Sequence, residues 1–167
     1  DGSIKLASLD VPGVDSFEIT NQMDGKGAGF GDRFWKWIGR GDLSAALQPC
    51  RPLLSVEYED RYLMTPISCA LLLEVVSAIK SFYEAEGEWG NVHVEIKTML
   101  IDESRLPRSR GHWWGADWDK TDRRDRAIEA AFEYSGMSAM VKSASRHDLS
   151  HGRRLILRFG DGGKISL

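Results

Sequence analysis

Alternating apolar and polar positions divide much of the chain into strands. Leu53–Tyr58 and Asn91–Met99 place apolar side chains at every second position, as a strand with one buried face does. Ala139–Ser143 and Arg153–Phe159 show the same period, and the second of these turns at the glycine-rich residues 160–163 into a last short strand. The pattern therefore predicts four core strands, the last of which opens a C-terminal hairpin.

Three segments have helical spacing instead. The longest begins with Thr65 as its cap and Pro66 in its first turn, and it continues to about Tyr83 with apolar residues nearly all round. Asp122–Tyr134 is amphipathic, and Asp32–Ile38 forms a shorter helix. Strands that alternate with helices predict an α/β fold, a mixed β-sheet whose faces are flanked by helices.

The opening of the chain is less regular. Ile4–Leu9 and Ser16–Thr20 alternate weakly and predict a hairpin or two edge strands. The glycine-rich stretch 25–31 leads into the first helix, either as a plain turn or as bare amides that hold an anion. We expect residues 1–29 to pack on one α/β domain that spans residues 30–167.

Composition favours a soluble domain inside the cell. The chain is 42% hydrophobic and 28% charged, which is typical of globular proteins, and no secretory signal opens it. Polar residues interrupt the longest apolar stretch, Ile67–Phe82, so we interpret it as a buried helix. Cys50 and Cys69 lack a disulfide spacing, which predicts a reduced, cytoplasmic setting. Because the chain begins at Asp1 without methionine, we expect it to be part of a multidomain protein.

Charge is distributed unevenly along the chain. Residues 1–100 carry 9 Lys and Arg against 15 Asp and Glu, whereas residues 101–158 carry 12 against 9, and ten of those twelve are arginines. Arginine suits bidentate contacts to phosphate or carboxylate. The loop 102–120 adds Trp113 and Trp114 to these cations, as single-strand nucleic-acid binders do. The alternative for these tryptophans is a lid that folds back over the core.

Histidine and arginine come together just before the C-terminal hairpin. His151 and Arg153 are two residues apart on a predicted strand, so they share a face and together suit a phosphate. The alternative is a histidine that hydrogen-bonds loop backbone. A metal site through His147, Asp148 and His151 would lack a fourth ligand, and we expect neither a metal nor a cofactor.

Asp60 and Arg61 end the first core strand. The carboxyl ends of strands are where α/β sheets collect ligands. Arg61 would there add a second phosphate contact, and Asp60 would orient His151. The alternative is an Asp–Arg pair that caps the following helix.

Two short motifs resemble a known family. His151-Gly152-Arg153 starts the C-terminal hairpin, and Asp60-Arg61-Tyr62-Leu63 precedes the long apolar helix. With the order of elements, they resemble the phospholipase-D-like C-terminal domain of MIT-domain-containing proteins. The wider superfamily uses a His-x-Lys motif in which four residues separate the lysine from a following acid, and here Arg153 and Arg158 occupy those two positions. The resemblance implies a homodimer that binds an anion without catalysis.

These observations predict a non-catalytic phospholipase-D-like binding module whose partner is nucleic acid or an anionic phospholipid. One alternative is a homodimeric phosphodiesterase in which His151 is the nucleophile, and another is a protein-interaction scaffold. The residues predicted to bind the ligand are Arg61, Asp60, His147, His151, Arg153, Trp113 and Trp114.

Overall fold

The structure is a computed structural model that describes residues 14–16, 29–38, 52–85, 87, 89–102 and 118–167. Its elements are β1 (Val14–Ser16), α1 (Phe30–Ile38), β2 (Leu53–Asp60), α3 (Pro66–Ala85), β3 (His93–Met99), α4 (Thr121–Tyr134), β4 (Ala139–Ala144), the short 3-10 helix η2 (Arg146–Asp148), β5 (Arg154–Phe159) and β6 (Lys164–Ser166). The predicted α/β class is confirmed, and the four predicted core strands are all present.

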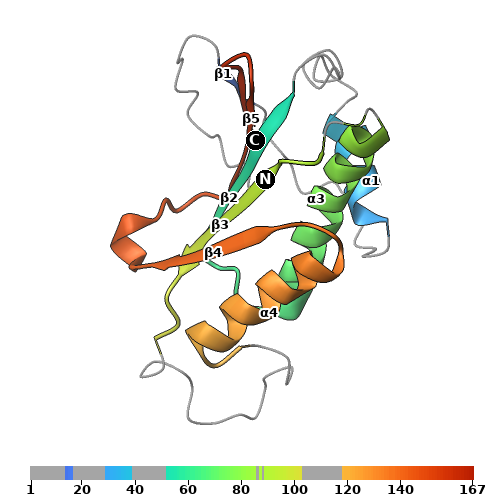
Figure 1. Ribbon diagram of the computed structural model, residues 1–167. Coiled ribbons are helices and arrows are strands. Elements are labelled where there is room, and N and C mark those ends of the chain that lie inside the picture. The colour runs from blue at the N-terminus through green and yellow to red at the C-terminus, as the bar shows by residue number, and fades with distance from the viewer. Residues whose placement is uncertain (1–13, 17–28, 39–51, 86, 88, 103–117) are drawn as a thin grey trace.

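The described strands form one mixed sheet, as predicted (Figure 1). Their order is β1-β6-β5-β2-β3-β4, with β2, β3 and β4 parallel to one another. β5 is antiparallel to both of its neighbours, β2 and β6. Parallel strands end at the same edge of a sheet, so β2, β3 and β4 end there together, and β5 begins there.

The opening of the chain lies mostly outside the described residues. β1 is an edge strand that pairs in parallel with β6. The predicted run 4–9 lies outside the described residues, as does all of 16–20 except Ser16. The division of the chain at residue 29 stays a prediction.

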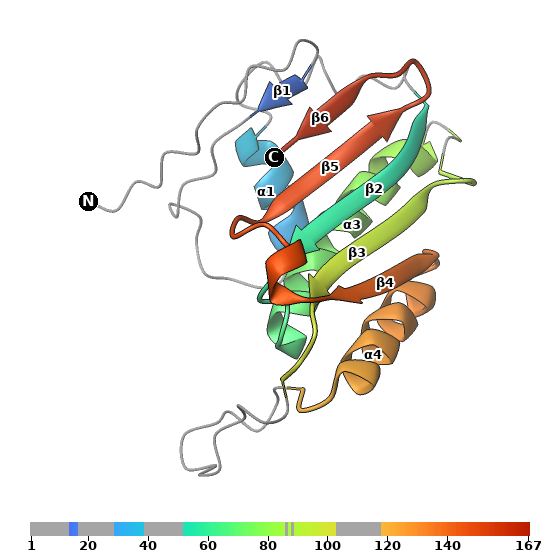
Figure 2. The same ribbon diagram turned by 90° about the vertical axis from the view of Figure 1, so that its left-hand side faces the viewer.

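All three described α-helices lie on one face of the sheet, as Figures 1 and 2 show together. The sequence had led us to expect helices on both faces, and that expectation was wrong for the described residues. The alternation along the strands explains why. Val56, Val94 and Ile96 are fully buried under the helices, whereas the positions between them, such as Glu57 and Glu95, point to the open face.

The open face carries charges that pair across strands. Arg158 of β5 binds the carboxylate of Glu57 on β2, and this contact lowers the pKa of Glu57. The carboxylate of Glu95 on β3 forms ion pairs with Nζ of Lys142 on β4, at 2.6 Å, and with Nζ of Lys97, at 3.1 Å. Burying such a ladder under another layer would remove it from water at a cost in free energy, and none of the described helices covers this face.

The β4 edge of the sheet is partly covered by α4. The backbone N–H of Val141 donates to Oε1 of Glu129, a residue of α4, at 3.0 Å. A backbone donor on an edge strand would otherwise be left to solvent or to another chain.

The long apolar helix α3 forms as predicted. The backbone N–H of Ser68 donates to the hydroxyl of Thr65 at 3.1 Å, which confirms the predicted cap. Its buried side chains are Cys69, Leu72, Val75, Val76, Ile79 and Tyr83. By length and composition alone α3 could cross a membrane, a test that core helices also pass. Here these six side chains belong to the hydrophobic core of the domain.

α1 crosses α3 at a contact that requires glycine. A Cβ atom on Gly31 would lie 2.0 Å from the carbonyl oxygen of Glu74 and 3.1 Å from Cβ of Ala78. Beside this contact, Nε1 of Trp35 donates to the carbonyl oxygen of Val75 at 2.8 Å. Gly31, which belongs to the glycine-rich stretch, therefore has a packing role.

Gly31→Ala is expected to lower the free energy of unfolding by about 1–3 kcal/mol, because the added methyl group forces the two helices apart. Urea denaturation measures this change. Gly90→Ala is the control, since no atom lies within 4 Å of the Cβ that it would add. Equal unfolding midpoints for the two variants would contradict the packing role.

Candidate functional site

Arg61, just after β2, fastens a separate segment of the chain. Its side chain is buried, with 4% of the residue exposed. The guanidinium donates to the carbonyl oxygens of Arg146, at 2.7 Å, and of Leu149, and it contacts the ring of His151 at 3.0 Å. These partners all lie in residues 145–153, which join β4 to β5. Arg61 therefore holds this connection against the end of β2.

A second anchor supports the same connection. The backbone N–H of Ser150 donates to Oε1 of Glu59, on β2, at 2.6 Å. At its beginning, Ser145 caps the short helix η2 and accepts from the backbone N–H of His147. Arg61 and Glu59 thus hold the connection to β2 and the turn after it, and the Ser145 cap orders its beginning.

Asp60 is buried, with 1% of the residue exposed, and its carboxylate accepts three hydrogen bonds. The backbone N–H of Tyr62 donates to Oδ1 at 2.7 Å. The hydroxyl of Tyr58 and Nε of Arg153 donate to Oδ2 at 3.1 and 3.0 Å. Burial and the charge of Asp60 raise the pKa of Tyr58, so this hydroxyl keeps its proton and stays a donor.

The structure brings four predicted residues together, but in pairs that differ from those expected. Asp60 holds Arg153 rather than His151, and His151 contacts Arg61. Because β5 begins at Arg154, both His151 and Arg153 precede the strand, so the argument from a shared strand face does not apply to them.

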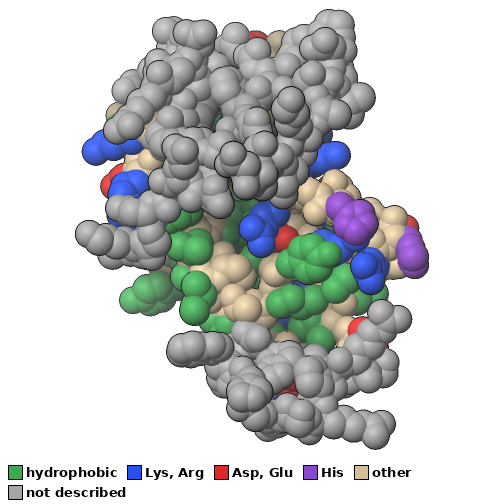
Figure 3. Space-filling view, turned by 180° about the vertical axis from the view of Figure 1, so that it is seen from behind, with side chains coloured by type: hydrophobic (Ala, Val, Ile, Leu, Met, Phe, Trp, Pro, Cys, Tyr) green, Lys and Arg blue, Asp and Glu red, His purple; other side chains and the backbone are tan. Residues whose placement is uncertain are grey.

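The fastened connection and the first residue of β5 present several cationic or titratable side chains to solvent. We call residues 145–154 the cationic segment. Its exposed arginines and histidines are Arg146, His147, His151, Arg153 and Arg154, and Asp148 adds one exposed carboxylate. Figure 3 shows histidine side chains beside Lys or Arg side chains at one side of the molecule. Such a cluster can attract an anion.

Two further sequence predictions concern the tryptophans of the loop 102–120 and the absence of a metal ion. Trp113 and Trp114 lie outside the described residues, so their role stays a prediction. Within the part of the chain that the structure describes, no three His, Cys, Asp or Glu side chains are grouped to hold a metal ion.

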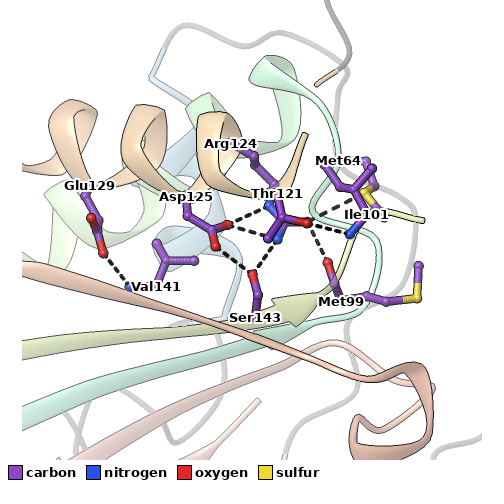
Figure 4. A network of polar contacts seen from close by, with 9 residues as sticks. All are labelled: Met64, Met99, Ile101, Thr121, Arg124, Asp125, Glu129, Val141 and Ser143. Atoms are coloured by element: carbon purple, nitrogen blue, oxygen red, sulfur yellow. Dashed lines mark hydrogen bonds and ion pairs between the residues drawn. The ribbon is translucent and has the colours of Figure 1, made fainter. Parts of the chain in front are cut away.

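A second buried arginine was missed by sequence reasoning (Figure 4). Arg124, on α4, is fully buried. Its guanidinium donates to the carbonyl oxygen of Met99 and to the hydroxyl of Ser143, both at 2.7 Å, and it pairs with Asp125 at 2.9 Å. The hydroxyl of Ser143 in turn donates to Asp125 at 2.7 Å. The network ties α4 to the carboxyl ends of β3 and β4.

The sequence did contain a signal for this network. Arg124 precedes Ile128 by four residues, which places both on one face of the helix. Because Ile128 belongs to the predicted inward face of this helix, the side chain of Arg124 is expected near the core or its rim.

The model of the family described as DEAD/DEAH box helicase YjiV, C-terminal domain, matches residues 13–167. The chain belongs to this family. The match to the YjiV C-terminal domain family includes every described element from β1 to β6. No curated protein and no solved structure matches the chain.

Membership of the YjiV C-terminal domain family shows that the predicted relationship to phospholipase-D-like domains of MIT-domain-containing proteins is wrong. The motifs behind that relationship were short, and the structure gives their residues local partners: Asp60 and Arg61 are buried against protein groups. The phospholipase-D-like binding module and the phosphodiesterase with His151 as nucleophile are therefore corrected to a helicase C-terminal domain.

Arg61→Ala is expected to release the connection between β4 and β5, because two backbone carbonyls lose their buried donor. The free energy of unfolding should fall by about 1–3 kcal/mol. Amides of residues 145–151 should lose protection from hydrogen exchange while those of β3 keep it. Arg146→Ala is the control, since it leaves the carbonyl that Arg61 contacts. Unchanged protection in Arg61→Ala would show that the connection is held without it.

Arg124→Ala is expected to destabilise the domain by about 3–5 kcal/mol, because it leaves the partly buried Asp125 without its cation. Arg126→Ala, which removes a side chain that is 79% exposed, should change stability by less than about 0.5 kcal/mol. Thermal and urea unfolding compare the two variants. Similar losses in both would contradict a special role for the buried network.

Proposed function

We propose that this domain is a nucleic-acid-binding accessory domain of a DEAD/DEAH box helicase, and that it contacts phosphates through the cationic segment 145–154. The observation that carries the proposal is the fastening of this exposed segment to β2 by the buried Arg61. A fastened segment meets a ligand without first becoming ordered, which favours binding.

The family supports the kind of ligand. Its description names a helicase, and the substrate of a helicase is nucleic acid. A C-terminal domain of such a protein belongs to the same polypeptide as the motor. Even weak phosphate contacts by this domain would then raise the local concentration of nucleic acid near the motor.

The distribution of ion pairs supports the place of binding. Among the described arginines of the basic half, Arg123, Arg126 and Arg158 pair with carboxylates at the surface, and Arg124 is paired inside. In the cationic segment, Arg153 pairs with the buried Asp60, whereas Arg146 and Arg154 form no ion pair with the described residues. The positive charge of this half is therefore least neutralised at this segment.

Two partners predicted from the sequence enter the experiment as its other outcomes. Anionic phospholipid offers the same phosphate chemistry, so liposomes are tested beside nucleic acid. The predicted homodimer is tested by sedimentation of the same samples.

The experiment measures binding of fluorescein-labelled single-stranded and duplex DNA and RNA at several salt concentrations. Arg146→Ala and Arg153→Ala should each weaken binding, because each removes one phosphate contact. Each should also reduce the slope of log K against log salt by about 0.7 for single strands and about 0.9 for duplex.

Arg126→Ala is the matched control, since it removes an exposed arginine from α4, outside the segment. Its salt slope should equal that of the unmodified protein. Absence of binding to every nucleic acid at low salt would refute the proposal. Binding to anionic liposomes alone would assign the segment to membranes instead.

A further inference from the structure

We infer that Asp60 is a positioning residue that holds Arg153 ready to grip one phosphodiester group with both of its terminal amino groups. This inference rests on the proposed function, because it states how the cationic segment would bind its ligand. Asp60 itself would touch no phosphate.

The pair joins a buried anion to an exposed cation. The side chain of Asp60 is 2% exposed and that of Arg153 is 69% exposed, and Oδ2 of Asp60 lies 3.0 Å from Nε of Arg153. Asp60 thus holds the guanidinium by the nitrogen nearest the backbone. The two terminal amino groups of Arg153 have no hydrogen-bond partner among the described residues.

The carboxylate that holds Arg153 is itself fixed. Oδ1 of Asp60 receives the backbone N–H of Tyr62, and Oδ2 receives the hydroxyl of Tyr58. Tyr58 is on β2, and Tyr62 follows the end of that strand. Both donors therefore belong to the rigid sheet or to the turn directly after it, so the carboxylate has little freedom to rotate.

The remaining donors of Arg153 match a phosphodiester. A guanidinium offers a side edge that includes Nε and an end that consists of the two terminal amino groups. Asp60 occupies Nε, which leaves the end available. A phosphodiester presents two non-bridging oxygens that share one negative charge, and the end of the guanidinium contacts both at once.

Two opposite effects of Asp60 on binding have to be compared. Its negative charge weakens the attraction of Arg153 for a phosphate, whereas its hydrogen bond removes the freedom that Arg153 would lose on binding. Immobilising a long side chain weakens binding by about two- to tenfold. The carboxylate of Asp60 is buried and already accepts hydrogen bonds from Tyr58, Tyr62 and Arg153, so we expect the positioning effect to dominate.

The central test is Asp60→Asn, measured with fluorescein-labelled oligothymidine. Kd should rise by about two- to tenfold, since Arg153 becomes mobile. The salt slope should stay unchanged because the number of phosphate contacts is the same. In Arg153→Ala, by contrast, both the affinity and the salt slope fall.

The double variant separates positioning from a general structural role. Asp60→Asn combined with Arg153→Ala should bind as Arg153→Ala alone does, because Asp60 then has no side chain to hold. Arg153→Lys keeps the charge but loses Nε and the paired amino groups. It should therefore weaken binding without changing the salt slope.

Two further variants control for charge and folding. Glu57→Gln removes a negative charge from β2 at a residue that pairs with Arg158, and it should leave Kd unchanged. Tyr58→Phe removes one donor to Asp60 without changing any charge, and it should raise Kd in the same direction by a smaller factor. If Asp60→Asn fails to fold, Tyr58→Phe decides the question.

The outcomes distinguish the inference from the proposed function. A folded Asp60→Asn protein that binds equally well or more tightly, while Arg153→Ala binds weakly, would overturn the positioning role and leave the function standing. An additive loss in the double variant would do the same. Failure of the unmodified protein to bind any nucleic acid would overturn both.

Discussion

Arg124 has lost all contact with water, and a guanidinium in that position persists only when its donors find acceptors inside the protein. One acceptor is the carbonyl oxygen of Met99, the last residue of β3. Arg61 does the same for two carbonyls in the connection before β5. Buried arginines thus satisfy backbone groups at the end of the sheet, where the strand ladder no longer does so.

The need to pair buried polar groups also gives the two faces and the carboxyl edge of the sheet different compositions. The helix-facing side of the sheet is apolar and supplies the core, whereas the open face carries paired charges. The edge of the sheet where β2, β3 and β4 end lies between the apolar side and the charged side, and it combines buried charges with exposed ones. Asp60 and Arg153 illustrate the combination, since the first is hidden and the second is accessible.

Much of the fold could be predicted from the sequence because period-two and helical patterns are local. The cap at Thr65 and the strand Leu53–Asp60 followed from residues next to each other in the chain. The sequence did not predict that one face of the sheet lacks helices. Glu57 and Glu95 alternate with core residues whether helices cover one face of the sheet or both. Their pairing partners on other strands decide the matter.

The sequence predicted which residues form the candidate site better than it predicted which of them contact one another. Asp60, Arg61, His151 and Arg153 do lie together, because the order of strands places the end of β2 beside the start of β5. Which carboxylate meets which cation depends on rotamers and on the irregular connection 145–153, and no periodicity describes these. The family resemblance failed for a related reason, since a strand–helix alternation is common to many α/β domains.

The contact between Glu129 and Val141 has a consequence for how copies of this domain behave when they meet. An edge strand with open backbone groups can recruit a strand from a second molecule and start a continuous sheet. Here one N–H at the middle of the β4 edge, that of Val141, already donates to the carboxylate of Glu129 on the neighbouring helix. An incoming strand would have to displace Glu129 and would then lie beside a negative charge, so this edge resists growth by strand addition.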